Sequence, residues 1–272
     1  MIAYSVPSAL VASWNDRPLI VRLQHPGQIG GLMSLVHPGG LLHIELPLSP
    51  STVEEIAEWR QPVPLHLVLS EPRDYPLLYR CTALLDHCPV RVAIPLIAGF
   101  ARAVRLAASL DLPVKLDLVP PPPQLLHELM DVLDLYLHRS TVAQPIEPFH
   151  SSLLAFFHQE PLTLWSIQEE DPALFRVVAE NGDERLPGRL ASERSSPGSG
   201  DFLDVWRGGL LAEQGECASC PHFDYCGGYF KWPDRSFSCI GVRTLFDRLS
   251  LAAAELRHDL AAFSSEGVED SR

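Results

Sequence analysis

Residues 65–118, LHLVLSEPRDYPLLYRCTALLDHCPVRVAIPLIAGFARAVRLAASLDLPVKLDL, contain three short apolar runs, at 65–69, 90–94 and 114–118. Each run has the length of a buried strand, and apolar residues recur at helical spacing in the stretches between them. Strands that alternate with helices of this length lie parallel in one sheet and are joined by right-handed crossovers. This segment therefore predicts two consecutive βαβ units and places the chain in the α/β class.

The same alternation continues on both sides of this segment. Further strands are expected at 18–23 and 42–46, and helices at 51–60, 74–87, 98–110 and 123–138. The series Ser51-Thr52-Val53-Glu54 has the pattern of a capping box, and Pro121-Pro122-Pro123 suits a helix entry because proline lacks the N–H that a first turn leaves unpaired. Five or six such units occur, and no glycine-rich phosphate loop follows the first strand. We therefore expect a partial (β/α) barrel rather than a doubly wound sheet.

The pattern changes after about residue 165. Residues 174–186 carry an Asn181-Gly182 turn that predicts a hairpin, and residues 192–200 form a loop rich in serine, proline and glycine. A short helix is expected at 201–212, and a long amphipathic helix from Val242 to Phe263. We therefore divide the chain into a partial barrel at 1–170, a small C-terminal domain at 171–263 and a frayed tail at 264–272.

Composition excludes several classes of partner. The 272 residues carry a net charge of −13, with 46% apolar and 20% charged residues. An acidic globular chain of this kind lacks the basic face that binds nucleic acids or anionic membranes. No apolar run approaches the roughly 20 residues of a membrane span, and Met1 to Arg17 do not resemble a secretory signal. We expect a soluble, cytoplasmic protein that binds neither nucleic acid nor membrane.

Four of the six cysteines, Cys217, Cys220, Cys226 and Cys239, fall within 23 residues. Thiols stay reduced in the cytoplasm, so a cluster of this density indicates metal binding rather than disulfides. Four thiolates can complete the coordination of an iron–sulfur cluster or of a tetrahedral zinc ion. The spacing Cys-x2-Cys-x5-Cys-x12-Cys leaves both possibilities open.

The residues around these cysteines resemble the SPASM domain, a C-terminal extension of radical SAM peptide-modifying enzymes. The similarity lies in CASCPHFDYCGG at 217–228 and in DVW at 204–206. It implies that the four cysteines ligate one auxiliary 4Fe–4S cluster. In the family these four positions ligate the second auxiliary cluster. The first auxiliary cluster is not expected, because Phe230 stands at one of its cysteine positions and Pro187 or Gly188 at another.

The resemblance extends weakly over the first 170 residues, where two family motifs are missing. No cysteine precedes Cys81, so the loop that would hold the SAM-cleaving cluster is absent, and Ile44-Glu45-Leu46-Pro47 replaces the Gly-Gly-Glu-Pro motif. The chain is similar to the SPASM-domain companions of GeoRSP-type peptide-maturation systems. This implies an accessory protein that does not bind S-adenosylmethionine and that partners a radical SAM/SPASM enzyme, with a precursor peptide as a further possible partner.

Two other functions remain open at this stage. The chain could be a zinc-stapled protein-binding module, or an independent enzyme that uses the mouth of the barrel. No nucleophile or phosphate loop supports the enzyme, and Glu147, His150 and His158 have no catalytic spacing. Whether the chain is an enzyme is therefore left undecided.

Several other residues have a structural interpretation. Cys81 and Cys88 are expected to be buried thiols, because no ligand partners surround them. His222 could tune a bound cluster or ligate zinc, although four cysteines already suffice. An aromatic group is expected to pack around the cluster or to form a docking face: Trp206, Tyr229, Phe230 and Trp232.

Overall fold

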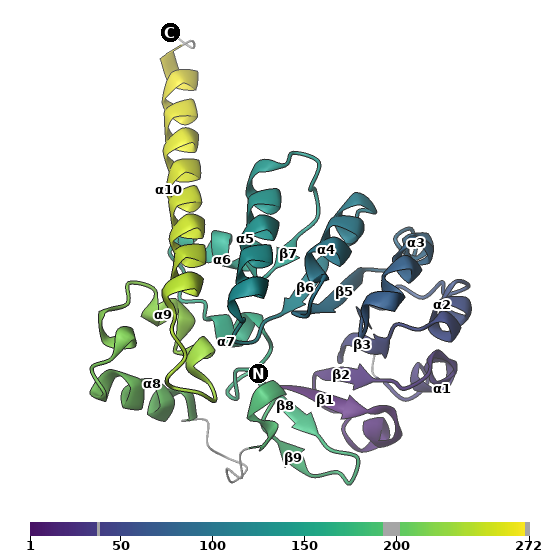
Figure 1. Ribbon diagram of the computed structural model, residues 1–272. Coiled ribbons are helices and arrows are strands. Elements are labelled where there is room, and N and C mark those ends of the chain that lie inside the picture. The colour runs from purple at the N-terminus through teal and green to yellow at the C-terminus, as the bar shows by residue number, and fades with distance from the viewer. Residues whose placement is uncertain (37–38, 193–201, 270–272) are drawn as a thin grey trace.

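The computed structural model describes residues 1–36, 39–192 and 202–269 (Figure 1). Within them the strands form one nine-stranded sheet in the order β7-β6-β5-β4-β3-β2-β1-β8-β9. Every neighbouring pair is parallel except β8–β9. The strands are β1 (Ala3–Pro7), β2 (Leu19–Arg22), β3 (Leu41–Pro47), β4 (Leu65–Val68), β5 (Val90–Pro95), β6 (Val114–Asp117), β7 (Ile146–Glu147), β8 (Phe175–Val178) and β9 (Glu184–Arg185). The predicted α/β class is confirmed.

Helices connect successive strands along one side of the sheet, and the last helix extends past the rest of the molecule (Figure 1). The final helix, α10, packs against α6 and α5. The helices are α1 (Ile29–Leu32), α2 (Pro50–Ile56), α3 (Leu78–Cys81), α4 (Phe100–Ser109), α5 (Pro123–His138), α6 (Phe149–His158), α7 (Leu164–Ile167), α8 (Phe202–Ala212), α9 (Phe223–Cys226) and α10 (Ile240–Glu269).

The two faces of the sheet differ in chemistry because side chains alternate along each strand. One face is apolar and belongs to the core with buried residues of α4, such as Phe100 and Val104. Its buried residues include Ile44, Leu46, Leu65, Leu67, Val92, Ile94 and Leu116. The other face, called the polar face below, carries His43, Glu45, His66, Arg91, Lys115 and Asp117 at the alternate positions. Parallel strands are usually apolar on both faces, so this polar row is unusual.

The sheet curls around its polar face. Residues of β1, β2, β3 and β6 line one cavity of about 390 Å³, although β1 and β6 are far apart in the strand order. The sheet also includes residues on both sides of the domain boundary that we expected at residue 170, because β8 pairs with β1. The hairpin predicted around Asn181-Gly182 is confirmed as β8–β9.

Three local expectations are wrong. The first strand is β1, which sequence reasoning missed because its polar residues and terminal Pro7 hide the apolar pattern. Helix α2 begins after Ser49 rather than Ser51, since the Ser49 hydroxyl accepts the Thr52 N–H at 3.2 Å. The helix expected at 74–87 is broken into α3 and flanking 3-10 segments, because Pro76 lies inside it.

At the C-terminal end, helix α10 continues to Glu269, past Phe263 and into the segment expected to be frayed. No proline interrupts residues 264–269, so polar composition alone does not end the helix. Residues 270–272 of the expected tail and 193–201 of the expected loop lie outside the described residues. The helix expected at 201–212 is confirmed as α8.

Candidate metal centre

The four clustered cysteines line one cavity of about 220 Å³. Cys217 lies in a 3-10 turn (Glu216–Ser219) and Cys220 follows it, Cys226 ends α9, and Cys239 directly precedes α10. All six cysteines of the chain are free thiols. The structure thus brings together the four residues that the sequence predicted as ligands, although they come from three separate turns.

The chain turns sharply after Cys226. Gly227 and Gly228 both have left-handed backbone conformations, with φ of 58° and 73°. In this turn the backbone N–H groups of Gly228, Tyr229 and Phe230 donate to the Cys226 sulfur. Successive N–H groups that converge in this way form a concave site for negative charge, a feature of many iron–sulfur sites. The turn is therefore suited to a Cys226 thiolate.

An ion pair between the buried Lys231 and the exposed Glu216 joins two of the cysteine-bearing turns. The Lys231 ammonium donates to Glu216 Oε2 at 2.8 Å and to the Phe237 carbonyl. The same carboxylate oxygen accepts the Cys239 N–H at 3.1 Å. Because Glu216 directly precedes Cys217, this carboxylate holds the first and last cysteines next to each other in space. Lys231 also adds a positive charge close to their sulfurs.

Burial keeps most of these thiols protonated when no metal is bound. It raises the pKa of Cys226 to about 11 and that of Cys239 to about 12, and it also raises the pKa of Cys217. Metal ligation requires thiolates, and a bound cation supplies the charge that makes deprotonation favourable. Binding of a cationic group would therefore balance the negative charge of the cysteine thiolates.

Among the described residues, no three of the four cysteine sulfurs all lie within 4.8 Å of one another. Within the described residues, the only set of three or more potential ligands whose donor atoms all lie within 4.8 Å of one another is His43, His66 and Glu169. Zn–S bonds of about 2.3 Å place tetrahedral sulfurs about 3.8 Å apart. A four-iron cluster binds each thiolate through a different iron, so it keeps the thiolates farther apart.

His222 lies near the cysteines without lining their cavity. Its Nε2 is 2.6 Å from Asp247 Oδ1, and its ring packs beside Phe156 and Phe246. One ring nitrogen is therefore already occupied by a carboxylate of α10. His222 belongs to the packing between the cysteine turns and α10.

The predicted aromatic group is buried, but it does not form the cavity wall. Trp206, Tyr229, Phe230 and Trp232 are at most 9% exposed. The aromatic rings that line the cavity are instead those of Phe223 and Phe246. The expectation that the predicted group surrounds the site is wrong for the cavity itself, because the turn at Gly227-Gly228 directs the chain back toward the sheet.

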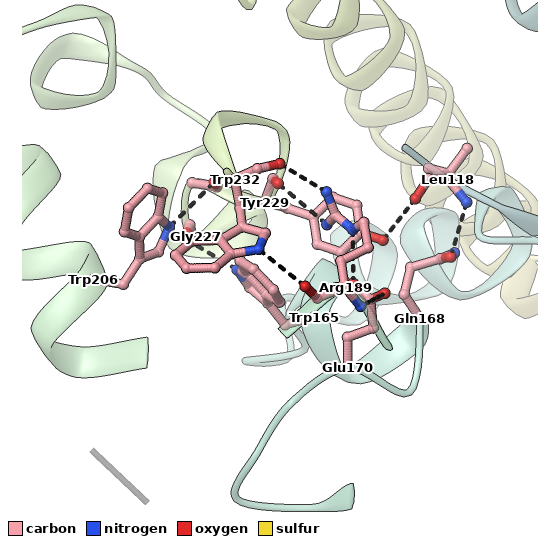
Figure 2. A network of polar contacts seen from close by, with 10 residues as sticks. Leu118, Trp165, Gln168, Glu170, Arg189, Trp206, Gly227, Tyr229 and Trp232 are labelled. Carbon is pink, nitrogen blue, oxygen red and sulfur yellow. Dashed lines mark hydrogen bonds and ion pairs between the residues drawn. The ribbon is translucent and has the colours of Figure 1, made fainter. Parts of the chain in front are cut away.

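Tyr229 and Trp232 take part in a polar network around Arg189 (Figure 2). The Arg189 guanidinium donates to Glu170 Oε2 at 3.1 Å, to the Trp232 carbonyl at 3.0 Å and to the Tyr229 carbonyl at 3.3 Å. Its charge also lies 4.1 Å from the centre of the Tyr229 ring. One arginine thus satisfies two carbonyls of the segment that follows Cys226.

The same segment is hydrogen-bonded to the carboxyl end of β6. The Tyr229 hydroxyl donates to the Leu118 carbonyl at 2.8 Å, directly after β6 (Figure 2). The Trp165 indole donates to the Gly227 carbonyl at 3.1 Å, and the Trp206 indole to the Gly228 carbonyl at 3.3 Å. The turn after Cys226 is therefore fixed from both α7 and α8.

A second polar site, on the polar face, was missed by sequence reasoning. Glu169 projects into it and pairs with Lys115 at 2.7 Å and with Arg91 at 2.8 Å. Burial alone would raise the pKa of Glu169, but Lys115 and Arg91 hold it well below its usual value. The sequence did contain a sign of this site. Polar and charged residues alternate with apolar ones along β3 to β6, and this alternation indicates a sheet with one polar face.

The remaining candidates behave as structural residues. Glu147 accepts the Ser151 N–H and hydroxyl, and His150 Nδ1 lies 2.9 Å from the Tyr136 hydroxyl. His158 packs edge-on against the neighbouring Phe157 ring. Each of these three residues has its own local contact, which supports the structural interpretation.

Cys81 and Cys88 are buried free thiols, as predicted. Burial raises the pKa of Cys81 to about 12 and also raises that of Cys88. Their sulfurs lie near the carbonyls of Leu77 and Leu84, one helical turn earlier. Both side chains belong to the apolar core.

Within the described part of the chain, no helix combines the length and the apolar composition that crossing a bilayer requires. Comparisons with protein-family models, with curated proteins and with solved structures give no match to this chain. The assignment of a function therefore depends on the geometry of the two sites.

Proposed function

We propose that this chain is an accessory iron–sulfur protein in which Cys217, Cys220, Cys226 and Cys239 hold one 4Fe–4S cluster. In this proposal residues 1–170 form a partial (β/α) barrel of the radical SAM type without its SAM cluster, and the cysteines belong to a SPASM-like domain. When bound, such a cluster accepts and donates single electrons.

The observation that carries the proposal is that all four cysteines line one cavity. Three backbone N–H groups directed at Cys226 favour a thiolate there, and such hydrogen bonds are among the groups that set cluster potentials. Lys231 and Glu216 hold the loops that carry Cys217 and Cys239 together. Four thiolates leave no iron open, so the proposed role is electron relay or docking rather than substrate coordination.

The alternative is a zinc-stapled binding module that uses the same four residues. The wide spacing of the sulfurs favours a multi-iron cluster, since a single tetrahedral ion draws its ligands to about 3.8 Å from one another. Both cofactors would stabilise the same turns. Metal content is therefore the measurement that separates them.

The test is anaerobic purification and reconstitution with iron and sulfide. The expected product is brown and contains about four irons per chain, as four thiolates holding one cubane cluster require. Cys226→Ser should lose most of this iron, whereas the matched substitution Cys88→Ser should retain it, because Cys88 is buried away from the cavity. Colourless protein with a bound zinc ion that Cys226→Ser loses and Cys88→Ser keeps would rule out the iron–sulfur function.

We propose a radical SAM/SPASM enzyme as the partner, with its precursor peptide as a second ligand. This part rests on the resemblance of residues 204–228 to SPASM companions. The test is co-expression with such an enzyme, if one is encoded beside this gene, followed by co-purification. Cys226→Ser should weaken the complex if the cluster domain forms the contact, and an absence of any complex with the cluster-loaded chain would contradict the partner.

The cavity on the polar face supports a second candidate function, an independent enzyme. The cavity of about 390 Å³ is lined by Arg22, Glu45, Lys115 and Asp117. Gln168 also lines it, and its amide nitrogen is buried without a hydrogen-bond partner in the part of the chain that the structure describes. Such a cavity can hold a small polar molecule. Turnover of a small substrate by the purified chain alone would favour this candidate.

A further inference from the structure

His43, His66 and Glu169 converge on the polar face, away from the four cysteines. Glu45 of β3 pairs in register with His66 of β4, so these two residues and His43 share one face of the sheet. The two imidazole rings lie 5.2 Å apart, edge to face. Glu169 enters from the end of α7 with a left-handed backbone, φ of 61°, which directs its side chain inward.

We propose that His43, His66 and Glu169 form a binding site for a divalent transition-metal ion of the zinc type. One donor atom from each residue lies within 4.8 Å of the others. Ligand atoms about 2.0–2.1 Å from zinc stand about 3.4 Å apart, so small side-chain rotations close the site. Two imidazoles with one carboxylate favour zinc-like ions over magnesium or calcium, and three protein ligands leave a position for water.

The ionisation states suit a metal ion. Burial lowers the pKa of His43 to about 4 and that of His66 well below its usual value, so both rings are neutral at neutral pH. Glu169 is held in its ionised form by Lys115 and Arg91. Neutral imidazole and carboxylate are the forms that ligate zinc, so binding requires no loss of protons from these residues.

His66 is incompletely satisfied when no metal is bound. It is 4% exposed, and its Nε2 is buried without a hydrogen-bond partner in the described residues. Its Nδ1 has only a 3.3 Å contact with Arg91 Nη2. An arginine can only donate, so Nδ1 accepts from Arg91 and the unpartnered Nε2 carries the proton; release of Arg91 frees the Nδ1 lone pair for an ion.

Arg91 occupies the position that a metal ion would take. Its Nη2 lies 2.8 Å from Glu169 Oε1 and 3.3 Å from His66 Nδ1, between two of the three ligands. The Arg91 side chain is 31% exposed, so it can swing out toward solvent when an ion enters. The buried Lys115 ammonium donates to Glu169 Oε2, which leaves Oε1 available to the ion. A cavity of about 210 Å³, lined by His43, His66, Arg91 and Glu169, gives access.

The test is zinc binding by the full chain, measured by equilibrium dialysis with counting of bound metal. His43→Ala and His66→Ala should each bind one zinc fewer than the wild type, and the control His87→Ala should bind the same number. Arg91→Gln should bind zinc about tenfold more tightly, because it removes the competing cation beside Glu169. The exposed Arg102→Gln controls for the change in net charge.

Zinc taken up by the cysteines is distinguished by NMR of the chain labelled with ¹⁵N-histidine. Zinc at the proposed site shifts ring nitrogens that are lost from the spectra of His43→Ala and His66→Ala, whereas zinc at the cysteines does not. If His66→Ala does not fold, the test uses His43→Ala and Arg91→Gln, because the His43 and Arg91 side chains are partly exposed. Equal zinc counts in wild type and His43→Ala, or equal affinity in wild type and Arg91→Gln, would overturn the proposal.

Discussion

Gly228 occupies a position that fits no other residue. Its φ of 73° is disfavoured for residues with a Cβ atom, and a Cβ there would lie 2.2 Å from Leu210 Cδ1 and 3.0 Å from Trp206 Nε1. The left-handed turn brings three N–H groups to the Cys226 sulfur. A single glycine thus links the packing of α8 to the electrostatics of the candidate metal centre.

Substitution of this residue should affect both stability and metal binding. Gly228→Ala is expected to lower the free energy of unfolding by about 2–4 kcal/mol, from backbone strain together with overpacking against Leu210. Gly182→Ala is the matched control, because Gly182 has φ of 87° but no atom within 4 Å of the added Cβ, so only about 1–2 kcal/mol of backbone strain is expected. Urea denaturation measures both values. Equal losses in the two variants would show that packing at Gly228 is unimportant.

At the scale of elements, the sequence predicted those whose signals are local. Helix α5 begins at Pro123, the last residue of the proline series, and the hairpin turns at Asn181-Gly182. The five strands predicted between residues 18 and 118 are all present as β2 to β6. These elements are fixed by periodicity and by turn chemistry, which neighbouring residues alone determine.

What could not be predicted depends on contacts between distant residues. The pairing of β1 with β8 joins residues that are about 170 positions apart, and neither strand has a strong apolar pattern. The grouping of His43, His66 and Glu169 requires the curl of the sheet and the left-handed turn at Glu169. Spacing did identify the four cysteines, but the cavity wall of Phe223 and Phe246 follows from the packing of α9 and α10.

Arg189 connects several elements, so its loss should be costly. Its side chain and that of Glu170 are 17% and 12% exposed, which makes this a largely buried ion pair. Arg189→Met should lower the free energy of unfolding by about 3 kcal/mol, because it removes the cation that pairs with Glu170 and one donor from each of two carbonyls. Addition of Glu170→Gln should recover part of the loss.

Arg207→Met is the control for this prediction, since Arg207 pairs with a fully exposed Asp224. An exposed pair contributes no more than about 1 kcal/mol. Denaturant unfolding of the three variants measures the difference. If Arg189→Met and Arg207→Met are equally stable, the network in Figure 2 does not hold the cysteine-bearing segment to the sheet.

At the scale of the whole molecule, the cysteine turns and the sheet share one apolar core and are also joined by specific hydrogen bonds. Tyr229 bonds to Leu118 after β6, and Trp165 bonds to Gly227. Strands β5 and β6 also contact α4, which lies outside the cysteine turns. The cysteine turns contain only short helical segments, so their own apolar core is small.

This asymmetry predicts the order in which the molecule opens when the candidate metal centre is emptied. Cys226→Ser, or removal of bound metal by a chelator, should increase amide hydrogen exchange at 216–239, because the proposed cofactor would hold these short turns together. Amides of β3 to β6 should remain protected to within about tenfold of the loaded protein, since their core contacts are unchanged. Cys88→Ser, which alters a buried thiol away from the cysteine cavity, is the control and should leave exchange at 216–239 unchanged. A parallel loss of protection in β3 to β6 would mean that Tyr229 and Trp165 transmit the loss of the cofactor to the sheet, and that the chain opens as one cooperative unit.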